Sequence, residues 1–303
     1  MHHCGTPDVH PGLLLFDKTV VRRLSKKYRR LLLYGSAYII FWMIGGCTSF
    51  FVLFPSKDAI DAPGAQRHTI DFEGGQLEIL TARSPAAINR EPEAYVLRFC
   101  GNAERAEWNA CRFGGGWNEK PIEMWSVNHP GFGGSSGSAR LARLAPAAIA
   151  AYDALAKEAA GKPIFISATS LGTTMALHVA KQRPVAGLIL RTPPPLRQLI
   201  IQRHGWWNLW LLATPVAMGV PSDIDSIANA QKADVPAVFI LMDSDTVVPL
   251  KYQQKVVDAY AGPKQLIISR GGDHNSILTP TAVDELAQQI DWLWQRSTAT
   301  VSK

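Results

Sequence analysis

The feature that most constrains the fold is an alternation of short apolar runs with longer helical stretches from residue 58 onward. The apolar runs favour strands and lie at 94–99, 123–127, 163–167, 185–190, 237–241 and 265–268. The helical stretches lie at 144–160, 171–182, 250–261 and 281–295. Strands that are joined by helices form a mostly parallel sheet with both faces covered. We therefore predict one α/β domain over residues 55–303.

Two segments depart from this alternation. Runs at 68–73 and 76–82, joined by Gly74-Gly75, predict a β-hairpin. Between residues 196 and 234 the strands stop, and three tryptophans fall within five residues: Trp206, Trp207 and Trp210. We expect a helical lid here, whose aromatic side chains either line an acyl pocket, lie at a bilayer interface, or only pack as a cap.

Residues 31–54 form an uncharged stretch of 24 residues directly after a basic segment. At ~1.5 Å per residue a helix of this length spans about 36 Å, enough to cross a ~30 Å hydrocarbon core. The alternative is a buried core helix. Basic residues before the stretch predict that the leader, residues 1–30, is cytoplasmic and that the C-terminal domain is periplasmic or extracellular. The sequence thus predicts a single-pass membrane protein with a signal-anchor helix.

Cys47 allows a second interpretation of the same stretch. Residues 44–47 (IGGC) resemble a bacterial lipobox, in which the cysteine is lipidated and becomes the mature N-terminus. The long basic leader and the apolar residues 49–54 speak against a lipoprotein. Both interpretations place the domain at a membrane surface, outside the cytoplasm.

The charge distribution argues against a nucleic-acid-binding protein. The net charge is 31 − 25 = +6, and residues 1–30 contribute seven basic and two acidic residues, so only +1 remains for the rest of the chain. A nucleic-acid-binding domain needs its basic residues on the domain itself. With 47% hydrophobic and 18% charged residues, the chain is also too apolar to be disordered.

Neither metal nor cofactor chemistry is indicated by the sequence. The glycines at 114–116 and 131–137 lack the spacing and the following lysine of a phosphate-binding loop. His2, His3, Cys4 and His10 have no regular ligand spacing. Cys100 and Cys111 either pair in an oxidising compartment or remain two separate thiols.

The first catalytic signal lies at residues 164–174 (IFISATSLGTT). An apolar strand runs into a small-x-Ser-x-Gly turn and a helix follows, which is the pattern of a nucleophile elbow. Ala168 and Gly172 are small because larger side chains there would collide with the neighbouring strand and helix. The pattern makes Ser170 the candidate nucleophile, with a simple helix cap as the alternative.

The ends of two later strands offer partners for this serine. Asp245 lies four residues before Pro249, and His274 lies in a glycine-rich loop. Ser170 needs a base, histidine has a pKa near neutrality, and an aspartate would hold the histidine in the right tautomer. Asp243 lies nearer its strand and is the competing acid.

In this order, these segments resemble the α/β-hydrolase superfamily, and within it the membrane-associated abhydrolase-domain and prolyl-oligopeptidase-like groups. The resemblance covers about residues 55–296. Residues 99–103 (FCGNA) look like the family's Phe-His-Gly-Asn-Ala segment, and residues 128–137 (NHPGFGGSSG) look like its glycine-rich turn. The resemblance implies an α/β-hydrolase fold, a mostly parallel sheet flanked by helices with a helical lid.

The resemblance also implies roles for individual residues. It assigns Ser170, Asp245 and His274 to a Ser-His-Asp triad, and it assigns the backbone N–H groups of Asn102 and Leu171 to an oxyanion hole. No cofactor is implied.

Two residues depart from the family pattern. Cys100 stands where the family usually has histidine, which leaves the bracing of the oxyanion loop open. Met242 stands where glycine is common, which keeps both Asp243 and Asp245 as candidate acids.

Three functions follow from these observations. The first is a membrane-tethered serine hydrolase that cleaves a carboxylic ester, a thioester or a lipid-like acyl substrate. The second is a peptidase or amidase on the same triad, and the third is a non-catalytic binding module. The intact set of triad residues favours an enzyme, but fold alone does not choose the substrate.

Overall fold

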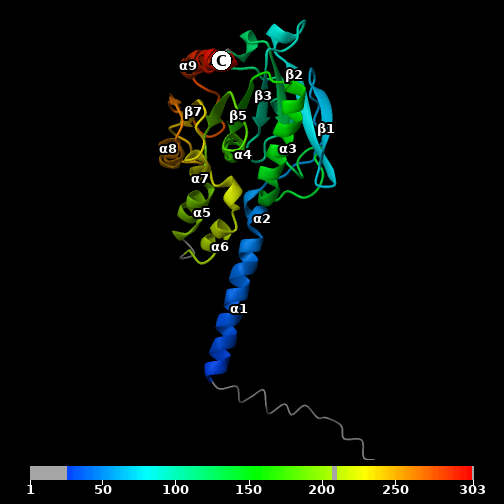
Figure 1. The fold of residues 1–303 in the computed structure, drawn as a ribbon. Coiled ribbons are helices and arrows are strands. Elements are labelled where there is room, and N and C mark those ends of the chain that lie inside the picture. Colours follow the sequence, from blue (N-terminus) through cyan, green and yellow to red (C-terminus); the bar gives the residue numbers. More distant parts are fainter. Residues whose placement is uncertain (1–25, 207–209, 302–303) are drawn as a thin grey trace, which may run out of the picture. The chain divides into compact units, whose positions relative to one another are not determined.

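The computed structural model describes residues 26–206 and 210–301 of the 303-residue chain. The chain divides into two compact units, residues 1–43 and 44–303, and every described strand belongs to the second (Figure 1).

The core of the second unit is an eight-stranded sheet. Its strands are β1 (Gln66–Phe72), β2 (Gly75–Arg83), β3 (Ala94–Phe99), β4 (Ile122–Val127), β5 (Ile164–Thr169), β6 (Gly187–Arg191), β7 (Ala237–Met242) and β8 (Lys264–Ser269). They follow the order β1-β2-β4-β3-β5-β6-β7-β8, antiparallel for the first two pairings and parallel for the rest. All the predicted strands are confirmed, with ends that shift by one or two residues.

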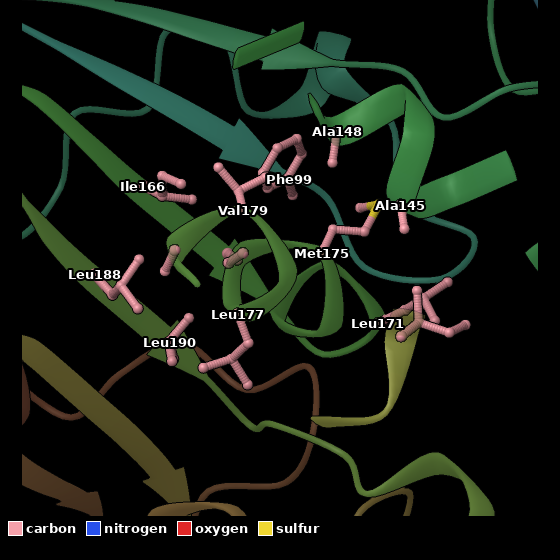
Figure 2. Packing of buried hydrophobic residues seen from close by; sticks show 14 of the residues in the cluster. Phe99, Ala145, Ala148, Ile166, Leu171, Met175, Leu177, Val179, Leu188 and Leu190 are labelled. Atoms are coloured by element: carbon pink, nitrogen blue, oxygen red, sulfur yellow. The ribbon is translucent and has the colours of Figure 1, made fainter. Parts of the chain in front are cut away.

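Helices cover both faces of this sheet. The helices α3 (Leu141–Ala159), α4 (Leu171–Ala180) and α8 (Leu250–Ala259) share one hydrophobic cluster with one face. Figure 2 shows part of this cluster, where Met175 and Val179 of α4 lie near Phe99 of the sheet. Helix α9 (Pro280–Val301) packs on the other face. The two-sided cover explains why the central strands are continuously apolar.

The predicted hairpin joins β1 and β2. Its turn residues are Glu73 and Gly74, with φ of 46° and 73°, one residue earlier than the predicted Gly74-Gly75. Positive φ at both central residues is typical of the turns that match the twist of two-residue hairpins.

Helical pieces fill the predicted insertion between β6 and β7. They are α5 (Leu196–His204), α6 (Ala213–Met218), the 3₁₀ turn η6 (Ser222–Ile224) and α7 (Ser226–Ala230). Earlier in the part of the chain that the structure describes lie the 3₁₀ turns η2 (Pro85–Ala87), η3 (Ala106–Trp108) and η4 (Trp117–Glu119).

The prediction of one transmembrane helix over residues 31–54 is wrong in its extent. Helix α1 runs from Lys26 to Gly46 and carries basic residues at its start, and a separate short helix, α2 (Thr48–Val52), follows it. Within residues 26–206 and 210–301, no helix has both the length and the apolar character needed to span a membrane.

The break at Cys47 has a local cause. Glycine is a poor helix former, and α1 ends on Gly45-Gly46. The Thr48 hydroxyl is shared between the carbonyls of Gly45, at 2.6 Å, and Val216 of α6, at 2.9 Å. These contacts tie the start of α2 to α6.

Residues 47–56, which we call the linker segment, pack into the second unit. Leu53 is only 4% exposed and belongs to the main hydrophobic cluster. The Leu141 N–H, at the start of α3, donates to the Ser49 hydroxyl over 2.9 Å. Thus part of the stretch that looked like a membrane segment serves as domain core.

Candidate active site

The loop between β5 and α4 has the geometry of a nucleophile elbow. Ser170 has φ 48° and ψ −119°, a strained conformation for a residue with a side chain. A Cβ on Gly172 would lie 2.3 Å from the Phe99 carbonyl oxygen, so only glycine fits where α4 passes the end of β3. Ala168 is 2% exposed and fits the same crowded turn. The sequence pattern therefore reflects real steric limits.

The structure brings Ser170, His274 and Asp245 into hydrogen-bond contact. His274 Nε2 lies 3.1 Å from the Ser170 hydroxyl oxygen, and His274 Nδ1 lies 2.7 Å from Asp245 Oδ2. Both Ser170, at 8% exposure, and Asp245, at 4%, are buried. Three loops that are far apart in the sequence, after β5, β7 and β8, supply them.

The Asp245 carboxylate is held by main-chain donors. Its Oδ1 accepts hydrogen bonds from the N–H groups of Val247, at 2.8 Å, and Val248, at 2.7 Å. Gln253 of α8 is fully buried and donates to Oδ2 over 3.4 Å. This leaves Oδ2 aimed at His274, which is the orientation that an acid in such a triad needs.

Asp243 has a different role in the structure. Its Oδ1 accepts from the Gly271 N–H at 2.7 Å and from the Ser244 hydroxyl at 3.0 Å. It therefore joins the loop after β7 to the loop after β8, while Asp245 contacts His274.

Met242, the departure from the family pattern, is accommodated by a glycine opposite. Met242 is fully buried, and a Cβ on Gly272 would lie 2.5 Å from the Met242 methyl carbon. Glycine in the His274 loop thus compensates for the larger residue at the end of β7.

The loop after β3, residues 100–104, lies beside the nucleophile. A Cβ on Gly101 would lie 3.6 Å from Ser170 Cβ. Among the described residues, the backbone N–H groups of Asn102 and Leu171 donate to no acceptor. They are the two groups predicted to form the oxyanion hole, and we call this segment the oxyanion loop.

Three side chains brace the oxyanion loop. His129 Nε2 lies 2.9 Å from the Cys100 carbonyl oxygen, and burial lowers the pKa of this imidazole, so the neutral ring donates the hydrogen bond. Glu104 accepts from the Gly101 N–H and from the Asn109 amide. The Asn102 side chain is bonded to the linker segment: its Oδ1 accepts from the Phe54 N–H at 3.0 Å, and its amide donates to the Val52 carbonyl.

Cys100 replaces the histidine that is usual in the family, which left open what holds the oxyanion loop. In this structure His129, from the glycine-rich turn after β4, contacts the loop at the Cys100 carbonyl. Cys100 is a buried free thiol and Cys111 an exposed one, so the two are not paired in this structure. Burial raises the pKa of the Cys100 thiol, which keeps it protonated.

Comparisons with known proteins address the fold. No protein-family model matches the chain. Among solved structures, a soluble variant of monoglyceride lipase from Saccharomyces cerevisiae, in complex with a substrate analogue, matches with a TM-score of 0.58 and 14% identity, over 80% of this chain and 98% of that one. The Pyrococcus furiosus esterase Pf2001 matches with a TM-score of 0.60 and 13% identity, over 82% and 98%.

A third match is Est1E from Butyrivibrio proteoclasticus with bound ferulic acid, with a TM-score of 0.60 and 16% identity, over 75% of this chain and 99% of that one. At these identities the matches show the fold alone. The chain has the α/β-hydrolase fold.

Sequence comparison adds two curated relatives, both uncharacterized proteins of Mycobacterium tuberculosis, from strains CDC 1551 and H37Rv. Each is 29% identical over 151 residues, which are 49% of this chain and 51% of theirs. The chain therefore matches about half the length of these relatives.

The predicted lid tryptophans lie on the insertion of the α/β-hydrolase fold. Trp206 is 72% exposed and Trp210 is 48% exposed, so neither is a buried packing residue. Trp207 lies outside the described residues. Arg203, at the end of α5, donates to the main-chain carbonyls of Thr246 and Val247, so the insertion contacts the loop that carries Asp245.

Two of the cavities differ in their relation to this site. One, of about 410 Å³, is lined by His274 and by residues at the carboxyl ends of the central strands. A larger one, of about 940 Å³, lies at the opposite ends of the strands, near Lys162 and Val235, and none of the triad residues lines it. In α/β sheets ligands bind at the carboxyl ends of the strands, and the smaller cavity lies at those ends, where His274 is the triad residue that lines it.

Sequence reasoning missed four supporting residues. Glu104, His129 and Gln253, and the side-chain role of Asn102, act through folded contacts with other loops. His129 and Glu104 lie in or next to segments that carried the family resemblance, so a signal existed for them. Gln253 lies mid-helix and gave none.

Proposed function

We propose that the chain is a serine hydrolase that cleaves a carboxylic ester, a thioester or a lipid-like acyl substrate through an acyl-enzyme. The observation that carries the proposal is the continuous contact from Ser170 through His274 to Asp245 on a strained elbow. A serine that merely caps a helix does not need a histidine bonded to a buried carboxylate beside it. The esterases and the lipase among the structural matches have the same fold and are consistent with this activity.

In the proposed mechanism, His274 Nε2 takes the proton from Ser170 as its oxygen attacks the acyl carbon. Asp245 holds His274 in the tautomer that leaves Nε2 free to accept, and its charge stabilises the imidazolium. The negative charge that forms on the carbonyl oxygen is stabilised by the N–H groups of Asn102 and Leu171. His274 then protonates the leaving alcohol or thiol, and a water molecule attacks the acyl-enzyme by the reverse path.

The exposed lid residues support an apolar acyl group in the substrate. Trp206, Trp210 and Leu211 present apolar surface on the insertion whose helix α5 contacts the triad loop. An acyl chain could be covered by such a surface, whereas a peptide would need polar groups that grip its ends. We therefore favour ester or thioester cleavage over peptide cleavage.

The proposal includes attachment to a membrane, with the hydrolase unit on the non-cytoplasmic side. Basic residues fill the leader, and helix α1 exposes large apolar side chains, among them Leu32, Tyr38 and Trp42. Such a helix favours a lipid environment, and basic flanks favour the cytoplasmic side. The alternative mode of attachment is lipidation at Cys47, which is exposed.

One experiment tests the activity and another tests the attachment. Labelling with a fluorophosphonate probe, followed by turnover of nitrophenyl esters of increasing chain length, measures serine reactivity and acyl preference together. No labelling and no turnover would remove the proposed activity. Fractionation after a carbonate wash, with mass spectrometry of the mature N-terminus, distinguishes an intact anchored chain from one that begins at lipidated Cys47; an intact chain in the soluble fraction would contradict both.

A further inference from the structure

A pocket behind the His274 loop has a charge pattern that the proposed mechanism does not use. We call it the basic pocket; it measures about 410 Å³, and its polar lining includes Arg98, Arg112, Arg191, Glu104, Ser167 and Thr169. Three arginines face one carboxylate in this lining. The volume is in the range of pockets that hold small organic molecules.

The sheet register explains why these groups converge. Arg98 of β3 pairs with Ser167 of β5, and Thr169 of β5 pairs with Arg191 of β6. Side chains at alternate positions of a strand point to the same face, and the neighbouring Val96, Phe165 and Ile189 all belong to the cluster on the α9 face. Two arginines therefore flank the hydroxyl groups of the central strand, on one face, at the carboxyl end of the sheet.

The two strand arginines are only partly satisfied. Arg98 uses Nη1 alone, toward the main-chain carbonyls of Asn109 and Arg112 and the sulfur of Met124. Arg191 uses Nη2, toward the carbonyls of His274 and Ser276, and its buried Nε has no hydrogen-bond partner. In the described part of the chain, neither arginine forms an ion pair.

Glu104 does not neutralise this charge by contact. Its two oxygens accept from the Gly101 N–H and the Asn109 amide, so it is committed to the oxyanion loop. Burial lowers the pKa of Arg191 and the nearby Arg98 lowers it further, while the charge of Glu104 acts in the opposite direction. A partly buried guanidinium whose Nε is shielded from water and has no partner is costly, and a bound anion would reduce that cost.

We infer that the basic pocket binds the carboxylate or phosphate group of a small amphiphilic molecule, with the anion between Arg98 and Arg191. Arginine suits this role because its planar N–H groups match two oxygens of a carboxylate or phosphate. The hydroxyls of Ser167 and Thr169, which have no partner among the described residues, offer further donors. Trp117, Met124 and Leu286 supply an apolar wall for the rest of the molecule.

Two kinds of molecule carry an anion that fits the basic pocket. The anion could be part of the substrate, bound next to His274, or a free acid that binds behind the His274 loop and changes its position. The first case deepens the proposed hydrolase function and depends on it; the second does not.

Direct binding tests the site itself. Calorimetry on the full chain, with inorganic phosphate and with hexanoate as probes, should show saturable binding. We expect Arg98→Met and Arg191→Met to weaken it about tenfold or more, the usual effect of losing a charge-assisted hydrogen bond. Arg83→Met, which removes an arginine of β2 outside the pocket, should leave it unchanged. Because Arg191 also holds the His274 loop, Arg98→Met is the decisive variant, with its fold checked by circular dichroism.

Turnover separates the two sources. The neutral ester 4-nitrophenyl butyrate and the acidic 4-nitrophenyl hydrogen succinate share one leaving group. A preference for the succinate that Arg98→Met abolishes places the anion on the substrate. Equal turnover together with anion binding identifies a free anion. Absence of turnover with retained anion binding would contradict the proposed function but support this site. The inference itself is overturned if neither probe shows saturable binding by about 10 mM, or if the variants bind the probes as tightly as the wild type.

Discussion

The two sides of the candidate site are held in place by different kinds of contact. On the triad side, Asp245 is fixed by N–H groups two and three residues away, and Ser170 by its own strained turn. On the oxyanion side, the Asn102 side chain is bonded to the linker segment, about fifty residues earlier in the chain. The contacts of the proposed triad are therefore largely local, while the proposed oxyanion hole depends on the N-terminal linker.

This difference has a functional consequence. The linker segment directly follows helix α1, and Thr48 joins it to α6 of the insertion. It therefore contacts both the insertion and the oxyanion loop. Changes in the linker should therefore weaken the oxyanion hole and lower turnover, while the reactivity of the serine–histidine pair is preserved.

The largest expected effect is on the triad side. Ser170→Ala removes the oxygen that is proposed to form the acyl-enzyme, so we expect turnover to fall by at least about 10⁴-fold and fluorophosphonate labelling to disappear. The fold should be unchanged, because alanine fits a turn that already holds serine. Labelling of the variant at the wild-type level would show that another residue is the nucleophile.

The next effect separates the two aspartates. Asp245→Asn leaves His274 without its acid and should lower kcat by about 10³- to 10⁴-fold. Asp243→Asn keeps an oxygen that can accept from the Gly271 N–H, so turnover should change by about twofold or less. The two variants are controls for each other, and a larger loss in Asp243→Asn would transfer the acid role to that residue.

The sequence was sufficient to predict the sheet, the elbow and the three residues that meet there. These features are encoded locally: alternating apolar strands, small residues around Ser170, and polar residues at strand ends. It was insufficient for the linker segment. An apolar, uncharged stretch satisfies the requirements of lipid and of protein core equally, and the linker segment is distinguished by its contacts with α3, α6 and the oxyanion loop.

The same limit applies to the residues that support the site. Whether Gln253 reaches Asp245 depends on how α8 packs against the end of β7, and no local pattern records that. Met242 looked like a disturbance of the acid loop because its partner, Gly272, lies thirty residues later. Long-range steric matching of this kind needs a structure, or an alignment of homologues, to be seen.

The free energy of unfolding tests whether the linker segment is part of the domain core. Leu53→Ala removes a side chain that is 4% exposed within the main cluster, so we expect the free energy of unfolding to fall by about 2–5 kcal/mol. Phe51→Ala, in the same segment but 55% exposed, should change it by about 0.5 kcal/mol or less. Equal, negligible effects in denaturant melts would mean that the linker is independent of the hydrolase unit.

The smallest effect is the most specific for the oxyanion side. Asn102→Ala keeps the backbone N–H that is predicted to bind the oxyanion but removes both side-chain bonds to Val52 and Phe54. Loss of an oxyanion donor costs about 10²- to 10³-fold in kcat, and a donor that is present but less firmly held should cost less, about tenfold. Because the donor acts on the charge that forms during reaction, kcat should fall while KM stays near its wild-type value.

Two further variants test the prediction for Asn102→Ala. Asn102→Asp can still accept from the Phe54 N–H, but its carboxylate faces the Val52 carbonyl and lies beside the developing negative charge, so its kcat should fall at least as far as that of the alanine variant. Asn118→Ala, an exposed asparagine on η4 away from the linker, is the matched control and should have no effect. Fluorophosphonate labelling of Ser170 should persist in every variant, because the serine–histidine pair is intact. A wild-type kcat in Asn102→Ala would mean that the oxyanion loop holds its position without the linker, and the contrast between the two sides of the site would then disappear.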